Sequence, residues 1–121
     1  MQAFIVENDD LLRDSMARLF RTKGYRVEAF RSAEEAEHPL EAAVPVVVIC
    51  DQDLPGMDGL TFLDRPGASR PGITRILICA HPSPRVAERI KRSRIDGCLL
   101  KPFSAEEVEQ VLTCLRSPGR S

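Results

Sequence analysis

No stretch of this sequence reaches the roughly 18 consecutive apolar residues that a membrane-spanning helix requires. The first residues, Met1 to Glu7, also lack the basic segment and long apolar segment of a signal peptide. Neither charge is in excess, because 17 basic residues stand against 18 acidic ones. That balance argues against binding nucleic acid or an anionic membrane through overall charge. We therefore expect a cytoplasmic protein without direct nucleic-acid or membrane binding, whose partners recognise a local surface.

The cysteines lack the Cys-x-x-Cys spacing that is typical of zinc sites and redox motifs. Most of them lie in apolar runs, which favours buried, reduced thiols over disulfides; they are Cys50, Cys79, Cys98 and Cys114. Internal repeats and low-complexity segments are lacking as well. A chain of 121 residues has room for one domain, which we assign to residues 1–116, with 117–121 as a tail or the start of a linker.

What the sequence does contain is a regular alternation of short apolar runs and amphipathic segments. The runs predict five strands, at residues 3–6, 25–30, 46–50, 75–80 and 97–100. Helices are predicted after each strand, beginning near Asp9, Ser32, Leu60, Arg85 and Ser104. Pro39 is expected to end or bend the second helix early. This order predicts a three-layer α/β sandwich around a parallel five-stranded sheet.

Asp51 directly follows the most apolar run, residues 46–50, which is typical of a strand buried on both faces. In open α/β sheets, ligands bind at the carboxyl ends of the strands. If the first, third, fourth and fifth strands are neighbours, their ends bring together Glu7, Asn8, Asp51, Cys79 and Lys101. Oxygen ligands suit Mg²⁺, a lysine neutralises phosphate oxygens, and a carboxylate can accept a phosphoryl group. Asp51 is therefore the candidate phosphoacceptor.

These residues resemble the receiver domains of response regulators in two-component signalling, over about residues 3 to 115. The resemblance rests on the acidic cluster after the first strand, on Asp51-x-x-x-Pro55-Gly56, and on Lys101-Pro102-Phe103. It implies a flavodoxin-like fold with strand order 2-1-3-4-5. It also implies that Asp51 takes a phosphoryl group from a sensor histidine kinase or a histidine phosphotransfer protein. Such a domain signals to a downstream protein or a fused output domain, and it is not an enzyme acting on a separate substrate.

The resemblance further implies the roles of single residues. Glu7, Asn8 and Asp51 would bind Mg²⁺ together with the backbone carbonyl of Asp53, and Lys101 would contact the phosphoryl group. Three positions depart from the family pattern. Asn8 replaces a usual acid and should weaken Mg²⁺ binding, Cys79 stands at the position of the switch Ser or Thr, and Cys98 replaces the switch aromatic. As a further hypothesis, Asp53 and His81 at the rim of the site form an ion pair.

Two alternatives remain at this point. A degenerate receiver would have the same fold and act as an unphosphorylated protein-interaction module, which the three departures favour. A haloacid-dehalogenase-like phosphohydrolase would use Asp51-Gln52-Asp53 as its DxD motif, although that motif normally follows the first strand. The basic segment 85–94 suits either a solvated helix face or a docking surface. A homodimer is possible, and the sequence leaves the oligomeric state open.

Overall fold

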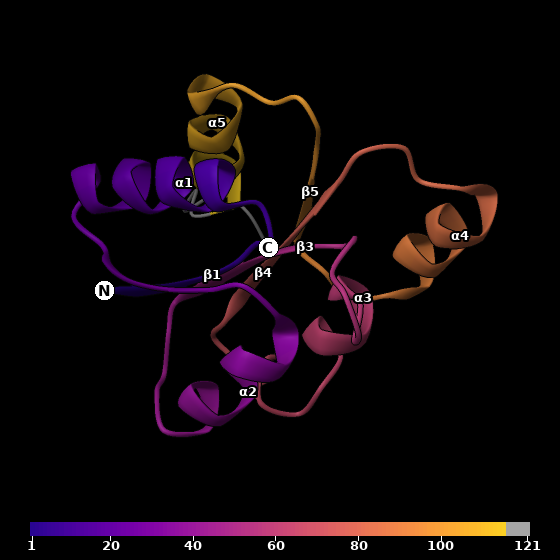
Figure 1. The fold of residues 1–121 in the computed structure, drawn as a ribbon, viewed down its shortest axis with the longest axis horizontal. Helices are drawn as coiled ribbons and strands as arrows, with labels where there is room; N and C mark the ends of the chain where they lie inside the picture. The colour runs from indigo at the N-terminus through magenta and orange to yellow at the C-terminus, as the bar shows by residue number, and fades with distance from the viewer. Residues whose placement is uncertain (116–121) are drawn as a thin grey trace.

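A five-stranded, all-parallel sheet with strand order β2-β1-β3-β4-β5 forms the centre of the computed structural model, which describes residues 1–115 (Figure 1). The strands are β1 (Gln2–Val6), β2 (Arg26–Phe30), β3 (Val47–Asp51), β4 (Thr74–Cys79) and β5 (Gly97–Leu100). The helices are α1 (Asp10–Thr22), α2 (Ala33–Glu41), α3 (Gly59–Leu63), α4 (Pro84–Arg92) and α5 (Ala105–Leu115). The predicted fold class and strand order are confirmed. The domain end at 116 and the tail at 117–121 lie outside the described residues.

The two faces of the sheet bury two separate clusters of apolar side chains. Because side chains alternate along a strand, Phe4 and Val48 face the cluster that includes α2 and α3, whereas Ile5 and Ile49 face the cluster that includes α1 and α5. Every residue of β3 is buried, as predicted for a central strand covered on both sides. The result is a three-layer sandwich in which α1 and α5 lie on one side of the sheet (Figure 1).

Side-chain caps start the helices where the sequence indicates. The Asp9 carboxylate accepts a hydrogen bond from the Leu12 amide at 3.0 Å, as expected for the N-cap of α1. Ser104 and Glu107 form a reciprocal capping box before α5, with both backbone amides donating at 3.1 Å. These local bonds explain why the helix starts could be predicted closely.

Pro39 lies inside α2 and does not end it, so the prediction of an early stop is wrong. The helix continues to Glu41 because Leu40, 2 % exposed, packs into the core on one face of the sheet. The Arg70 guanidinium also donates to the carbonyl oxygens of Leu40 at 3.0 Å and Ala43 at 2.8 Å. Burial and this distant arginine therefore offset the hydrogen bond that proline cannot donate.

The expectation of buried thiols holds for only half of the cysteines. Cys50 and Cys79 are buried, whereas Cys98 and Cys114 are exposed, and all four are free. Cys98 lies on β5, an edge strand, so one neighbouring strand is missing. Among the described residues, no helix combines the length and apolar character needed to cross a membrane.

Candidate functional site

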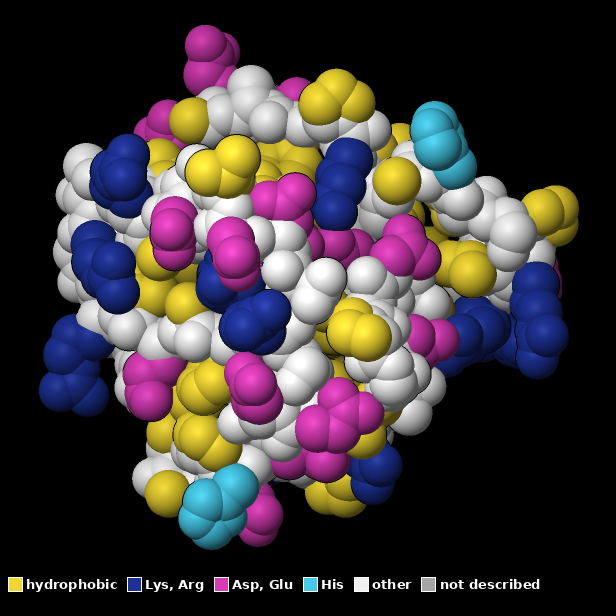
Figure 2. Space-filling view, viewed as in Figure 1, with side chains coloured by type: hydrophobic (Ala, Val, Ile, Leu, Met, Phe, Trp, Pro, Cys, Tyr) yellow, Lys and Arg dark blue, Asp and Glu magenta, His cyan; other side chains and the backbone are white. Residues whose placement is uncertain are grey.

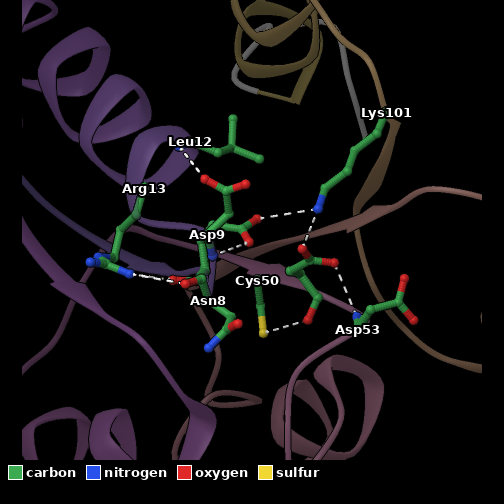
Figure 3. Close-up of polar contacts among 9 residues, drawn as sticks. Asn8, Asp9, Leu12, Arg13, Cys50, Asp53 and Lys101 are labelled. Atoms are coloured by element: carbon green, nitrogen blue, oxygen red, sulfur yellow. Dashed lines mark hydrogen bonds and ion pairs between the residues drawn. The ribbon is translucent and has the colours of Figure 1, made fainter.

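Three predicted site residues meet at the carboxyl edge of the sheet. Glu7 follows β1, Asp51 is the last residue of β3, and Lys101 follows β5. The Lys101 Nζ lies 2.5 Å from Asp51 Oδ2 and 3.6 Å from Glu7 Oε1 (Figure 3). Parallel strands end at the same edge, so residues more than 40 positions apart in the sequence come into contact. The cluster places one ammonium group against two carboxylates.

Asp51 is held in place by the backbone on both sides of it. Its Oδ1 accepts a hydrogen bond of 3.0 Å from the Asp53 amide, and the side chain is 2 % exposed. The chain then turns so closely that a Cβ on Gly59 would lie 2.9 Å from the Asp51 carbonyl carbon and the Gln52 Cα. Only glycine fits at that position, because both neighbours are backbone atoms. The phosphoacceptor candidate therefore has little freedom to move.

Glu7 is the second buried carboxyl group of the site, beside Asp51. Its Oε2 accepts from the Asp9 amide at 3.0 Å, whereas its Oε1 is buried without a hydrogen-bond partner. Burial raises the pKa of Glu7 to about 7, and Asp51 adds to the rise, against the lowering effects of the Asp9 amide and the Lys101 charge. Around neutral pH, Glu7 is thus poised between its protonated and ionised forms.

Lys101 compensates only part of the negative charge. Burial lowers the pKa of its ammonium group, but the hydrogen bond and charge of Asp51, together with Glu7, outweigh burial and leave that pKa raised. The lysine is therefore charged at neutral pH. When Glu7 and Asp51 are both ionised, the three groups carry one net negative charge.

This donor set fits a hard divalent cation. Glu7 follows β1 and Asp51 ends the neighbouring strand β3, so their carboxylate oxygens lie side by side. A cation would give Glu7 Oε1 a close partner, because that oxygen has no hydrogen bond and the Lys101 ammonium group is 3.6 Å away. Within residues 1–115, no group of three or more His, Cys, Asp or Glu side chains is arranged to hold a metal. A magnesium ion does not require one, because it usually binds one or two carboxylates and keeps several waters.

Asn8 lies next to this cluster and is exposed. Arg13 from α1 donates to the backbone carbonyl oxygen of Glu7 at 2.9 Å and reaches that of Asn8 at 3.5 Å, which orders the turn after β1 (Figure 3). Among the described residues, no hydrogen bond joins the Asn8 side chain to Glu7, Asp51 or Lys101. Asn8 is therefore beside the site and outside its network of direct contacts.

Cys79 and Cys98 form a thiol pair on β4 and β5. Their Sγ atoms are 3.7 Å apart, and the Cys79 carbonyl oxygen accepts from the Lys101 amide at 2.9 Å. Burial raises the pKa of the Cys98 thiol to about 12, and the neighbouring Cys79 raises it further. At neutral pH the Cys98 thiol is protonated. The pair occupies the two positions where the resemblance implies a hydroxyl and an aromatic ring.

The predicted ion pair between Asp53 and His81 is absent. Both residues are exposed, and none of the ion pairs among residues 1–115 joins them. Asp53 contributes instead through its backbone, whose amide binds Asp51. His81 lies in the loop after β4, and no hydrogen bond or ion pair among the described residues joins it to Glu7, Asp51 or Lys101. The structure therefore lacks the ion pair that we predicted at the rim of the site.

Sequence reasoning did not identify a second polar network next to Asp51. Gln52 is buried, with 5 % of the residue exposed. Its side-chain amide donates to Asp58 Oδ2 at 3.0 Å and accepts from the Leu60 amide at 2.8 Å. Asp58 also accepts from Arg89 Nη1 of α4 at 2.7 Å. Burial alone would raise the pKa of Asp58, but hydrogen bonds from Arg89 and Thr61 hold it well below its usual range. Asp58 before Leu60 fits an N-cap pattern, whereas nothing in the sequence links it to an arginine 31 residues away.

The sequence matches the family profile of the response regulator receiver domain over residues 3–113. It is 33 % identical over 108 residues to the C4-dicarboxylate transport transcriptional regulatory protein DctD of Rhizobium meliloti, covering 88 % of this chain and 23 % of that protein. It is 30 % identical to the virulence transcriptional regulatory protein PhoP of Salmonella typhimurium, covering 89 % and 48 %. It is 31 % identical to the transcriptional regulatory protein BasR of Escherichia coli, covering 95 % and 52 %. The chain thus spans between about a quarter and a half of these relatives.

Solved structures agree in fold. A CheY-like response regulator receiver domain protein from Methanospirillum hungatei superposes with a TM-score of 0.85 at 24 % identity, covering 94 % of this chain and 92 % of that one. A DNA-binding response regulator of the LuxR family from Staphylococcus aureus gives a TM-score of 0.82 at 26 % identity, covering 95 % and 98 %. Both cover nearly the whole described sheet and its helices.

Proposed function

The chain belongs to the response regulator receiver domain family, and on that premise we propose that Asp51 accepts a phosphoryl group from a phosphohistidine. The donor would be a sensor histidine kinase or a histidine phosphotransfer protein. The single observation that carries the proposal is the contact of Lys101 Nζ with Asp51 Oδ2 at 2.5 Å, beside a Glu7 oxygen that has no hydrogen-bond partner. A carboxylate so placed has both a cation for phosphate oxygens and a site for a divalent metal.

The chemistry follows from what each side chain can do. An oxygen of the Asp51 carboxylate forms a bond to phosphorus, and the bond from phosphorus to the donor histidine nitrogen breaks. The Asp53 amide keeps Asp51 oriented, because it already holds Oδ1 at 3.0 Å. Lys101 transfers its contact from Asp51 Oδ2 to a phosphoryl oxygen, where it neutralises negative charge. The transfer is self-directed, so the domain is a switch and not an enzyme that turns over a separate substrate.

Receiver domains generally bind Mg²⁺, and we propose the same for this chain. Glu7 and Asp51 would supply carboxylate oxygens, Asp53 its backbone carbonyl and Asn8 an amide oxygen. When bound, the cation neutralises the negative charge that accumulates as phosphate approaches two carboxylates. Asn8 removes one formal charge relative to a second acid, so binding should be weaker than in a site with that acid.

The second candidate is a degenerate receiver that signals without phosphorylation. The observation that favours it is the thiol pair of Cys79 and Cys98, whose Sγ atoms touch at 3.7 Å in place of a hydroxyl and an aromatic ring. A thiol is a weak donor to a phosphoryl oxygen. The phosphohydrolase alternative has lost its support, because the chain belongs to the receiver family and its DxD follows the third strand.

The output is proposed from the relatives. DctD, PhoP and BasR are described as transcriptional regulatory proteins, and this chain covers at most 52 % of their lengths. We propose that a fused output domain or a separate downstream protein responds to the receiver, so that any DNA contact is made outside residues 1–115. Cytoplasmic location and formation of a homodimer belong to the same proposal.

The test uses small-molecule phosphodonors. The protein is incubated with Mg²⁺ and acetyl phosphate, or with Mg²⁺ and beryllofluoride, and its intact mass and backbone amide shifts are followed. We expect a phosphoryl adduct on the wild type, no adduct on Asp51→Asn, and a strongly reduced adduct on Lys101→Ala. A wild type that forms no adduct with either reagent would establish the degenerate receiver. Steady release of phosphate from a separate phosphomonoester would contradict the absence of enzymatic turnover.

A further inference from the structure

Within residues 1–115, helix α4 is the one helix without a buried residue. None of its residues from Pro84 to Arg92 is buried, and only Val86 and Ile90 pack partly against the core. The helix lies out to one side of the sheet (Figure 1), and Lys and Arg side chains gather at that end of the molecule (Figure 2). Burial therefore contributes little to holding α4 in place, and polar contacts matter correspondingly more.

One of its cations has a specific partner. Arg89 places Nη1 2.7 Å from Asp58 Oδ2 and Nη2 3.3 Å from Asp58 Oδ1, and Nη2 also reaches the Thr61 hydroxyl at 3.3 Å. The two side chains are 30 % and 31 % exposed, so the pair is shielded in part from solvent. A bidentate arginine–carboxylate contact fixes the relative orientation of the two side chains as well as their distance. Arg89 is thus a directional link between α4 and the start of α3.

Asp58 continues this link toward the phosphoacceptor. The Gln52 amide bridges Asp58 and the Leu60 amide, so both ends of a buried side chain are engaged. The Gln52 backbone carbonyl also accepts from the Gly59 amide at 3.2 Å. Gln52 lies between Asp51 and Asp53, the two residues that the proposed function places at the phosphoryl group and the metal. A displacement of this backbone would be passed on to Asp58, because the nitrogen and the oxygen of the buried Gln52 side chain are both hydrogen-bonded.

We propose that Gln52, Asp58 and Arg89 are positioning residues that fix the loop carrying Asp51 and Asp53 and couple the state of that loop to helix α4. The coupling of helix α4 to phosphorylation of Asp51 rests on the proposed function, whereas the positioning of the loop does not. The hydrogen bonds from Gln52 to Asp58 and from Arg89 to Asp58 involve neither Cys79 nor Cys98. Because coupling is reciprocal, freeing α4 must also change the affinity of the Asp51 site for a phosphoryl analogue.

The test measures amide hydrogen exchange residue by residue in four proteins. They are the wild type, Arg89→Ala, Asp58→Asn, and the matched control Arg92→Ala, which removes an exposed arginine from the same helix. Without beryllofluoride, we expect Arg89→Ala and Asp58→Asn to speed exchange at Leu60 and Asp53 at least about fivefold, and Arg92→Ala to leave both unchanged. Equal exchange in Arg89→Ala and wild type would overturn the positioning role.

The second arm adds Mg²⁺ and beryllofluoride and reads the exchange of residues 87–92. We expect the analogue to alter this exchange in wild type and Arg92→Ala but not in Arg89→Ala, although Arg89→Ala still forms the adduct with an affinity changed at least about fivefold. A full α4 response in Arg89→Ala would overturn the coupling. If the wild type forms no adduct, the proposed function fails, and the first arm alone decides whether the three residues position the loop. An adduct without an α4 response in the wild type would reject the coupling and leave the proposed function intact.

Discussion

The centre of the sheet and its β5 edge are built in opposite ways. At β1 and β3, apolar side chains such as Ile5 and Ile49 are completely buried, and helices cover both faces. At β5 and α4, Cys98 is exposed, Leu100 is 55 % exposed, and no α4 residue is buried. The first region holds the carboxylates Glu7 and Asp51 still, because densely packed side chains leave them no room to move.

The difference in packing indicates which part of the domain is easiest to displace. Glu7 and Asp51 stand at the ends of the densely packed strands β1 and β3, and Lys101 reaches them from the end of β5 at 3.6 Å and 2.5 Å. The α4 region is held mainly by one ion pair and two partly buried apolar side chains, so a small free energy can displace it. The two buried carboxyl groups and helix α4 thus lie in regions that differ in how tightly their side chains are packed.

The largest effect is expected on the free energy of unfolding, when a buried isoleucine and a partly buried one are each replaced by alanine. Ile49→Ala should lower the free energy of unfolding by about 2–5 kcal/mol, because Ile49 is 0 % exposed and its removal leaves a cavity in β3. Ile90→Ala should cost less than about 1 kcal/mol, because the α4 side chain is only partly buried. Urea denaturation followed by circular dichroism and fluorescence of an extrinsic probe measures both. Equal losses would contradict the contrast between the two regions.

A smaller effect is expected for the close turn after Asp51. Gly59→Ala should destabilise the fold by about 1–3 kcal/mol, because the new Cβ lies 2.9 Å from backbone atoms of Asp51 and Gln52 that cannot yield. The control is Gly67→Ala, whose Cβ would lie 3.6 Å from Leu40 Cδ2, an ordinary contact. We expect that control to stay within about 0.5 kcal/mol of wild type. Thermal unfolding of the three proteins side by side shows whether the tight approach has this consequence.

The buried Glu7 predicts a dependence of stability on pH. Its folded pKa of about 7 lies above the model-peptide value of 4.5, so the folded state binds more protons and stability falls as pH rises from about 4.5 to 7. We expect a loss of roughly 1–2 kcal/mol after allowance for solvent screening. Glu7→Gln, which keeps a neutral side chain, should flatten this fall, and millimolar Mg²⁺ should reduce it in the wild type. Parallel pH profiles for wild type and Glu7→Gln without metal would refute the assignment.

The smallest effect is expected on the reactivity of the Cys98 thiol at the β5 edge of the sheet. Cys98 should react slowly with iodoacetamide at pH 8 despite its exposure, because its pKa is raised to about 12 and little thiolate is present. Cys79→Ala removes the neighbouring sulfur and should speed the reaction of Cys98 severalfold. Peptide mass spectrometry follows the rate, with the exposed Cys114 as the internal reference. An unchanged rate in Cys79→Ala would show that the pair does not control the thiol.

Much of the site could be predicted from the sequence because its residues stand at strand ends. The carboxyl ends of parallel strands lie at one edge of the sheet. The positions of the strands, together with the strand order that the resemblance implies, therefore brought Glu7, Asp51 and Lys101 together. The same argument did not hold for the predicted ion pair of Asp53 with His81, because both residues lie in loops beyond the strands. Strand register constrains a residue at the end of β3 and does not constrain a side chain two positions into a turn.

The amino-acid sequence by itself determined the order of strands and helices, the helix caps at Asp9 and Ser104, and the edge where the charged groups gather. Those features depend on apolar periodicity and on bonds between residues a few positions apart. Only the tertiary structure decided that α2 continues past Pro39, that Cys98 stays exposed, and that Arg89 meets Asp58. Each of these depends on which distant surface lies opposite a residue, and a linear pattern of residue types does not specify that surface.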